Sequence, residues 1–239
     1  MKSFFKLFRN FIIILTILVI LIFAFITFRG YNMYKSALTD MDLNSKINLI
    51  KSNNKYYVYY EEIPKDYINA LVAVEDHRFF EHKGIDFIAL ARAIIVNVTS
   101  QSLLQGGSTI TQQLSKNMYF TQEKDLDRKI AEVFMSSYLE KNLSKEKILE
   151  LYINTSYFGD GYYGLGQASK GYFNKEPKDL TLYECVLLAG VPNAPSIYAP
   201  TANMDLCIQR QNQVINAMLE HNYITEDTAN KIREEQPKF

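Results

Sequence analysis

The feature that most constrains the fold is an apolar run near the N-terminus, from Phe11 to Phe28, which contains no charged residue. A helix needs about 18 to 20 apolar residues to cross the roughly 30 Å hydrocarbon core of a bilayer. A helix in the core of a globular protein is rarely apolar on every face for so long. The run therefore predicts a transmembrane helix over residues 11–28 rather than a buried core helix.

This run is more typical of an uncleaved signal anchor than of a cleaved signal peptide. It exceeds the roughly 7 to 15 apolar residues of a signal peptide, and no small-x-small cleavage site follows it closely. Basic residues flank the run on both sides, namely Lys2, Lys6 and Arg9 before it and Arg29 and Lys35 after it. The positive-inside tendency favours a cytoplasmic N-terminus at residues 1–10 and places the rest of the chain outside.

The rest of the chain has the size of one exported domain. Residues 29–62 are mostly polar and are expected to form a linker, and residues 63–239 are expected to form a single domain with a substantial core. The formal net charge is zero, which argues against a nucleic-acid partner because such binding relies on a basic surface. Cys185 and Cys207 are too few for a disulfide framework and lack metal-ligand spacing, so each is predicted to be a small buried hydrophobe.

Apolar periodicity and capping residues predict a mainly α-helical domain. A helix after Pro64 should end near Glu75. Asp86 can cap a helix over residues 87–98, which is apolar around most of its circumference and is expected to be buried or partly in lipid. Residues 56–60 are expected to be extended or a short strand. The other expected helices are 109–117 capped by Ser108, one from Asp125 or Asp127 to about Glu140, one from Ser144 to Asn154, 182–189 after a Thr181 and Glu184 capping box, 206–219 and 226–235.

Two carboxylates stand close in the sequence to clustered cations. Glu75 is followed by His77, Arg78 and His82, and Glu132 is preceded by Lys116, Lys124, Arg128 and Lys129. A carboxylate can take the proton of a sugar hydroxyl, and cations can neutralise a departing pyrophosphate. The residue types therefore suit proton transfer beside a departing anion.

Each of these features also has a simpler interpretation. Arg128 and Glu132 are i and i+4 neighbours on a helix, and periodicity alone favours an exposed ion pair. His77 and His82 match no common zinc motif and are expected to be structural hydrogen-bonding groups. The Gly106-Gly107-Ser108 turn can cradle a phosphate or serve as a capped turn. Taken one at a time, the features do not decide the function.

Five motifs in a fixed order decide between these interpretations. They are EDxxFxxHxG at 75–84, GGSTxTQQ at 106–113 followed by Lys116, RKxxE at 128–132, KxxILExYLNxxYFG at 145–159 with Ile153 in place of leucine, and a closing motif at 180–196. In this order they resemble the peptidoglycan glycosyltransferases, which are membrane-bound enzymes that polymerise lipid-linked disaccharides into bacterial cell-wall glycan. The resemblance implies a lysozyme-like helical fold with a membrane-facing hydrophobic lobe, for which residues 87–98 are the candidate.

The resemblance also assigns roles to individual residues. Glu75 would be the general base that deprotonates the acceptor's sugar hydroxyl, which attacks the anomeric carbon of the donor in an inverting single displacement as the lipid pyrophosphate leaves. Glu132 would assist at the pyrophosphate or organise its neighbours. The residues implied to bind substrate are Ser108, Thr109, Gln112, Gln113, Lys116, Lys124, Arg128 and Lys129. Lys124 stands where many members carry arginine, so a point charge there replaces a bidentate fork.

The same resemblance implies the surroundings of the enzyme. Lipid II and the growing glycan chain would be its substrates, and membrane lipid and other cell-wall synthesis proteins its partners, with no nucleic acid. It would cross the cell membrane once, with the catalytic domain on the extracytoplasmic side. No cofactor or bound metal is required, although some members are stimulated by a divalent cation, Mg or Mn. The chain ends soon after the motifs, without room for a penicillin-binding transpeptidase domain, which favours a monofunctional enzyme.

Two rival functions stay open. A lysozyme-like hydrolase or lytic enzyme also places a catalytic glutamate in a helical domain, but it needs no pyrophosphate site. The basic cluster from Lys116 to Lys129 and the membrane span favour a lipid-linked donor instead. An inactive membrane-anchored scaffold that keeps the fold is the second rival. The loss of either key acid would favour it, but Glu75 and Glu132 are both present.

Overall fold

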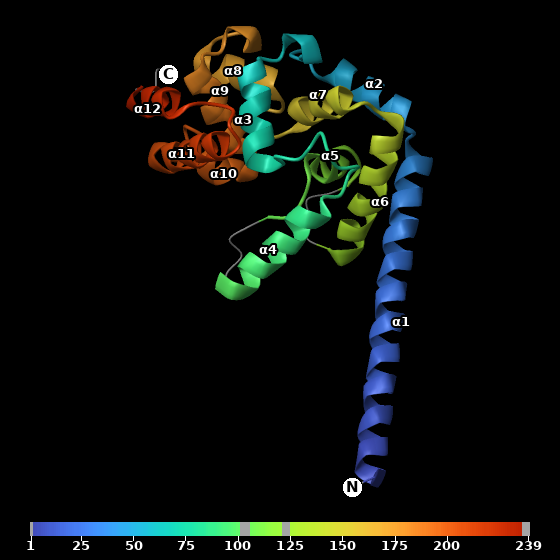
Figure 1. Cartoon of the computed structure of the whole chain (residues 1–239). Coiled ribbons are helices and arrows are strands. Elements are labelled where there is room, and N and C mark those ends of the chain that lie inside the picture. The colour runs from blue at the N-terminus through green and yellow to red at the C-terminus, as the bar shows by residue number, and fades with distance from the viewer. Residues whose placement is uncertain (1, 101–105, 121–124, 236–239) are drawn as a thin grey trace.

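The computed structural model describes residues 2–100, 106–120 and 125–235, and it is mainly helical (Figure 1). Within these ranges the only β-type pairing is an isolated antiparallel bridge between Tyr157 and Tyr163. The predicted mainly α fold class is therefore confirmed. The helices are α1 Lys2–Asp40, α2 Leu43–Asn53, α3 Lys65–Glu75, α4 Phe87–Ser100, α5 Ile110–Tyr119, α6 Leu126–Asn142, α7 Lys145–Thr155, α8 Leu165–Phe173, α9 Leu182–Gly190, α10 Pro195–Tyr198, α11 Met204–Glu220 and α12 Glu226–Glu234, with short 3-10 helices η1 Tyr60–Glu62, η2 Pro177–Asp179 and η3 Val191–Asn193.

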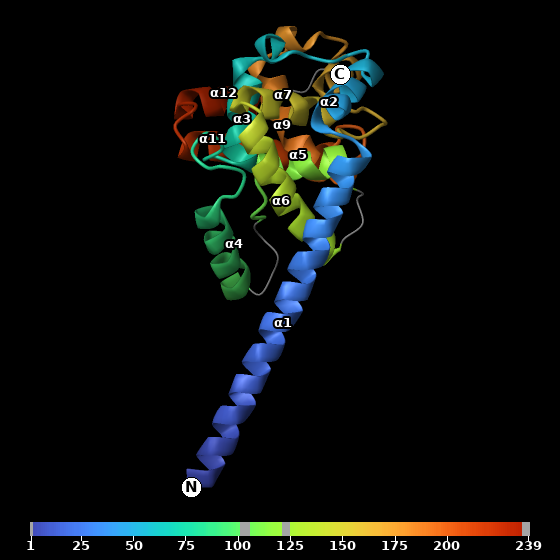
Figure 2. The same cartoon turned by 90° about the vertical axis from the view of Figure 1, so that its right-hand side faces the viewer.

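Helix α1 extends far beyond the rest of the molecule (Figure 1, Figure 2). Among the described residues, α1 is the one helix that is long and apolar enough to cross a membrane, over Phe4–Asp40. The side chains of residues 4–25 are all exposed, so this apolar run is not the core of the domain. The alternative of a buried core helix is wrong.

The segment expected to be a polar linker is largely helical. Helix α1 continues to Asp40, and α2 begins after Asp42, whose carboxylate accepts hydrogen bonds from the backbone N–H groups of Asn44 and Ser45. Of the two alternatives for residues 56–60, the short strand does not form, and Tyr59 has an extended backbone. The backbone groups of Val58 are satisfied by a side chain instead, since the Asn154 amide accepts from the Val58 N–H and donates to the Val58 carbonyl, both at 2.8 Å.

The end of α1 packs along α6, and the two helices run in the same direction (Figure 2). At Gly30 the approach is so close that an added Cβ would lie 2.5 Å from side-chain atoms of Ile130. Beside this contact, the Arg29 guanidinium pairs with the Asp127 carboxylate at 2.6 Å. The membrane-type helix is thus fixed to the first turns of α6.

The hydrophobic core lies where α3, α9 and α11 pack together and where α5 packs against α6 and α7. Large fully buried side chains such as Tyr67, Phe79 and Tyr152 fill it. Cys185 and Cys207 are both free and buried, as predicted, and burial raises the pKa of each thiol to about 12. This core holds the ends of α3, α5 and α6 in fixed positions, and these ends carry the motif residues.

Most of the predicted helix starts are confirmed. Asp125, Ser144 and Thr181 each cap a helix, and Thr181 forms the expected capping box with Glu184. Asp86 caps α4 by accepting from the N–H groups of Ile88 and Ala89. The prediction that Ser108 caps the next helix is wrong. Thr109 is the cap of α5, and its own capping box with Gln112 fixes that start.

Helix α4 lies apart from the other helices of the domain (Figure 1). Several of its apolar side chains are exposed, namely Phe87 at 72%, Ile88 at 60% and Ile95 at 63%, whereas Ala93 is buried. Of the two expected environments, burial in the core is therefore wrong. A surface this apolar is typical of a helix that meets lipid or another protein.

Candidate active site

Glu75 is the last residue of α3, and two donors hold its carboxylate. Gln113 donates its amide N–H to Oε2 at 2.8 Å, and Arg210 donates from Nη2 to Oε1 at 3.1 Å. Tyr152 fixes Gln113 in turn by donating its hydroxyl to the amide oxygen at 3.1 Å. Only 6% of the Glu75 side chain is exposed. Because a carboxylate has about four acceptor positions, Glu75 keeps room for one more hydroxyl proton.

Asp76, the next residue, braces the first motif against the second. Its carboxylate accepts from the Ile110 N–H at 3.0 Å, at the start of α5, and contacts the His82 ring nitrogen Nε2 at 2.9 Å. His82 is thus the structural hydrogen-bonding residue that was expected. His77 instead stacks on His221, with ring centroids 4.3 Å apart and planes 2° from parallel. Burial and the neighbouring His221 lower the pKa of His77.

Glu132 lies at the centre of a second charged cluster on α6. Arg128 and Lys129 both pair with its carboxylate, Lys129 at 2.8 Å. The side chain of Glu132 is 2% exposed and that of Arg128 is 11% exposed, so the interpretation as an exposed surface ion pair is wrong. Lys129 also donates to the Ser108 hydroxyl at 2.7 Å. The second and third motifs therefore meet at this cluster.

Lys116 lies within electrostatic reach of Glu75 and of Arg128 in the second cluster. Burial and the charge of Arg128 lower the pKa of Lys116, while Glu75 raises it. Burial, followed by the charges of Arg128 and Lys116, lowers the pKa of Lys129 to about 8, and its contact with Glu132 opposes that shift. Burying cations beside one another costs free energy unless an anion neutralises them. The cluster is therefore suited to bind an anion such as a phosphate.

Two of the remaining predicted site residues have structural roles, and one is not described by the structure. Thr109 and Gln112 are buried, and their side chains are used in the α5 cap, where the Thr109 hydroxyl also donates to the Gly84 carbonyl at 2.7 Å. Both thus have structural roles, and substrate contact by either stays a prediction. Lys124 lies outside the described residues.

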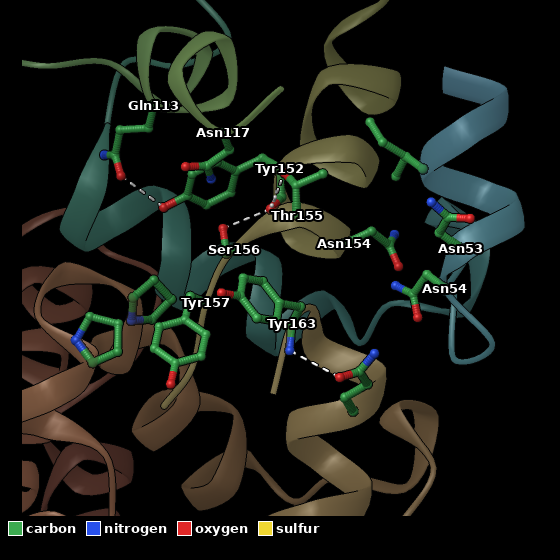
Figure 3. A pocket seen from close by; sticks show the side chains of 14 residues that line it. Asn53, Asn54, Gln113, Asn117, Tyr152, Asn154, Thr155, Ser156, Tyr157 and Tyr163 are labelled. Atoms are coloured by element: carbon green, nitrogen blue, oxygen red, sulfur yellow. Dashed lines mark hydrogen bonds between the residues drawn. The ribbon is translucent and has the colours of Figure 1, made fainter. Parts of the chain in front are cut away.

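Two cavities meet at Gln113. The first, of about 690 Å³, is lined by Glu75, His77, Arg92, Ser108 and Arg210 among others. The second, of about 550 Å³, is lined mostly by amide and aromatic side chains, as Figure 3 shows for Asn53, Asn54, Asn117, Asn154, Tyr157 and Tyr163. Amide and tyrosine side chains combine hydrogen-bonding groups with flat apolar faces, which suits them to bind sugars or peptides. A reaction between two large substrates needs two such sites on either side of the reacting atoms.

Arg210 is the contact of Glu75 that the motif comparison did not single out. It comes from α11, its Nε donates to the Gly190 carbonyl at 3.2 Å, and its guanidinium lies 5.8 Å from the centre of the Tyr198 ring. The sequence holds one signal for it. Arg210 lies between Cys207 and Val214 on the buried face of an otherwise regular amphipathic helix, where a charged residue requires a partner.

No group of three or more His, Cys, Asp or Glu side chains that could hold a metal ion occurs among the described residues. The independence from a cofactor and the stimulation by Mg or Mn therefore both stay predictions. The chemistry available from the described side chains is proton transfer at Glu75 and charge neutralisation by Lys116, Arg128 and Lys129.

The arrangement of these motifs agrees with comparison to known proteins. The chain matches the family model described as Transglycosylase over residues 42–219. The chain belongs to the transglycosylase family. Its lysozyme-like helical fold is the one expected from the motifs.

Several curated penicillin-binding proteins resemble the chain. It is 45% identical over 181 residues to penicillin-binding protein 1A of Aquifex aeolicus, covering 74% of this chain and 25% of that protein. It is 39% identical over 216 residues to penicillin-binding protein 1A of Vibrio cholerae, covering 85% and 26%. It is 44% identical over 174 residues to penicillin-binding protein 1F of Bacillus subtilis, covering 73% and 24%. The chain thus spans about a quarter of the length of these relatives.

Proposed function

We propose that this transglycosylase is a peptidoglycan glycosyltransferase that polymerises lipid II into linear glycan strands. The observation that supports this most directly is the pairing of two sites. A buried carboxylate, Glu75, is held in a cavity with an acceptor position free, and a cluster of cations around Glu132 lies across Lys116 from it. The first can accept a proton and the second can bind a pyrophosphate.

In the proposed reaction, Glu75 takes the proton of the acceptor's sugar hydroxyl. The hydroxyl oxygen forms a bond to the anomeric carbon of the donor, and the bond from that carbon to the phosphate oxygen breaks on the opposite side. The electron pair leaves with the polyprenyl pyrophosphate, whose added charge Lys116, Arg128 and Lys129 neutralise. Because the attack and departure are on opposite faces, the anomeric configuration is inverted.

The two cavities support a reaction with two bulky sugar substrates. Gln113 lies between them and contacts Glu75, so a donor and an acceptor that fill both cavities would meet beside the carboxylate. Glu132 would act by holding Arg128 and Lys129 in place, since it contacts both. A general base contributes about a hundredfold to ten-thousandfold to a rate.

We further propose that α1 anchors the enzyme in the cell membrane with the catalytic domain outside. The exposure of the side chains along residues 4–25 supports the anchor. The three basic residues before the apolar run, against Arg29 and Lys35 after it, support the orientation. Membrane lipid, the growing glycan chain and other cell-wall synthesis proteins are the partners that this placement implies.

The test is incubation of the detergent-solubilised full chain with labelled lipid II, followed by separation of the products by size. Wild type should give a ladder of glycan polymers. Glu75→Gln should lower polymerisation by about a hundredfold or more while leaving donor binding largely intact. Asp227→Asn is the matched control, because its carboxylate is 77% exposed and pairs only within α12.

Each other outcome assigns a different function. Breakdown of preformed glycan without polymerisation would move the chain to the lytic class. If neither activity is seen, and thermal melting shows that wild type and both variants are equally folded, the chain is a non-catalytic scaffold. Full polymerisation by Glu75→Gln would remove Glu75 as the base.

A further inference from the structure

An aromatic and basic cleft lies away from the active site, at the junction of α1 and α6. Its volume is about 460 Å³. The residues that line this junction cleft are Tyr31, Tyr34, Lys83, Phe134, Ser137, Tyr138, Glu140 and Lys141. None of them belongs to the catalytic constellation described above.

The junction cleft begins immediately beyond the apolar run of α1. Tyr31 follows Phe28 by about 4.5 Å along the helix and Tyr34 follows it by about 9 Å, at 1.5 Å per residue. The polar zone of a bilayer adds about 5 to 7 Å on each side of its hydrocarbon core. The exposed apolar helix α4 extends from the domain to the same side as α1 (Figure 1, Figure 2). With α1 across a membrane, the lower edge of the cleft at Tyr31 lies in the zone of lipid headgroups, and Tyr34 lies just beyond that zone on the side of the domain.

The aromatic residues of the cleft form one continuous surface. The Tyr31 and Phe134 ring centres are 5.3 Å apart, those of Tyr34 and Phe134 are 6.0 Å apart, and those of Tyr34 and Tyr138 are 6.2 Å apart. Tyr31 is nonetheless 39% exposed. Tyrosine, with an apolar ring and a polar hydroxyl, is enriched at the level of lipid headgroups for this reason.

The charge of the cleft is positive. Within the described part of the chain, neither Lys83 nor Lys141 has a carboxylate within ion-pair distance, and both are exposed. The acid beside them, Glu140, is already neutralised, because it accepts from Lys145 at 2.8 Å and from the Thr111 hydroxyl at 2.6 Å. The unpaired charge of the two lysines is therefore available to an anion.

We propose that the junction cleft binds the headgroup of an anionic glycerophospholipid. The phosphate lies between Lys83 and Lys141, the glycerol lies beside Tyr34, and the upper acyl chains cover the rings of Tyr31 and Phe134 toward the membrane. Each lysine near an anionic membrane surface contributes up to about a fivefold preference, so two lysines favour an anionic over a zwitterionic lipid by up to about 25-fold. The proposal rests on the membrane placement of α1 but not on the chemistry at Glu75.

The test exploits the absence of tryptophan from the chain. Phe134→Trp gives the full chain a single tryptophan inside the cleft, and Tyr31→Trp is a second version at its lower edge. Each variant is reconstituted into phosphatidylcholine vesicles that hold one tenth brominated lipid, either phosphatidylglycerol or phosphatidylcholine, brominated near the top of the acyl chains. Bromine quenches tryptophan fluorescence only on contact. We expect quenching by the brominated phosphatidylglycerol to be severalfold stronger at the same mole fraction.

Charge variants separate this site from general attraction to the membrane. Lys83→Gln with Lys141→Gln should make quenching by the two brominated lipids equal. The matched control is Lys170→Gln with Lys178→Gln, which removes two exposed lysines from α8 and η2 and should leave the preference unchanged.

Three results would overturn the proposal. They are equal quenching by both lipids in the parent variants, an unchanged preference after removal of Lys83 and Lys141, and no quenching by either lipid although the protein floats with the vesicles. The last would mean that protein, not lipid, fills the cleft. If the protein does not float with the vesicles, the proposal that α1 is a membrane anchor is wrong. Lipid II polymerisation in detergent, measured on the same variants, tests the proposed chemistry separately.

Discussion

Glu75 and Glu132 are both buried carboxylates, but their partners differ. Glu132 is neutralised by the two cations Arg128 and Lys129 of its own helix. Glu75 is held by one amide and one guanidinium from two other helices, α5 and α11. A carboxylate bound by two adjacent cations is a poor proton acceptor, whereas one that is oriented with an acceptor position free is suited to general-base catalysis. The contacts thus favour Glu75 as the base and Glu132 as the organiser of the cations.

Arg210 should act as a positioning residue for Glu75. We expect Arg210→Gln to lower kcat about tenfold to a hundredfold with little change in KM, since a hydrogen bond to a charged group contributes about 1.5–3 kcal/mol. Arg210→Lys should recover part of the rate, and Arg233→Gln on α12 is the control. Steady-state polymerisation of lipid II measures both parameters. An unchanged kcat in the folded variant would contradict the assignment.

Lys129 gives the enzyme an expected alkaline limit. Its lowered pKa means that the folded protein loses this proton at about pH 8, well before a free lysine with a pKa of 10.5. As the pH rises through that range, the cluster loses positive charge and binds an anionic donor less well. We expect kcat/KM, which reports the free enzyme, to fall between pH 8 and 10 in wild type. Lys129→Arg keeps its charge and should extend the plateau; superimposable profiles would exclude Lys129.

The sequence predicted the motif residues at this scale, but only some of their contacts. The pairing of Arg128 with Glu132 follows from helical spacing, and the fold decides that the pair is buried. The contact between Glu75 and Arg210 joins residues 135 positions apart, and no local pattern encodes it. Residue types and spacing therefore predict which residues form the candidate site. The burial and the contact partners of those residues depend on how the helices pack.

At the scale of elements, the start of α5 connects the fold to the site. Three contacts from the first motif and the helix itself converge there, because Asp76 accepts the Ile110 N–H, Gly84 accepts the Thr109 hydroxyl, and Gln112 closes the capping box. Helix starts elsewhere were predictable from single residues such as Ser144 and Thr181. Here serine and threonine are adjacent and both can cap a helix, so local propensity could not choose between them.

The adjacent hydroxyls permit a paired test. Thr109→Ala should lower the free energy of unfolding by about 1–2 kcal/mol, because it removes both the cap and a buried hydrogen bond. Ser108→Ala should leave stability within about 0.5 kcal/mol of wild type but reduce polymerisation, since the Ser108 hydroxyl contacts only Lys129 among the described residues. Thermal melting in detergent and the lipid II assay on both variants check this. Destabilisation by Ser108→Ala alone would reverse the assignment of the cap.

For the whole molecule, α1 is the element whose sequence prediction was least complete. Hydropathy identified the membrane-type segment from Phe11 to Phe28, but it could not show that the same helix continues to Asp40 and packs along α6. The extension contains polar and charged residues, so it is not part of the apolar run that hydropathy detects. The contact depends on the small size of Gly30, whose helical neighbours do not indicate a partner a hundred residues away.

The same contact joins α1, the proposed membrane anchor, to the helix of the cation cluster, because α6 carries Arg128, Lys129 and Glu132 within two turns of Ile130. Gly30→Leu would place its Cβ within 2.5 Å of Ile130 and separate the helices. We expect a loss of at least about tenfold in polymerisation of lipid II in vesicles. Ser36→Leu, on the exposed side of α1, is the control.

A graded series makes the physical cause testable. Gly30→Ala adds only the Cβ and should have a smaller effect than Gly30→Leu, since the neighbouring Ile130 side chain must move less. If the anchor serves only as a tether, all three variants will polymerise lipid II at the wild-type rate. If its packing sets the height of the cation cluster above the membrane, activity should be highest for Ser36→Leu, lower for Gly30→Ala and lowest for Gly30→Leu. The melting temperature of the full chain should change less across the series than the activity does.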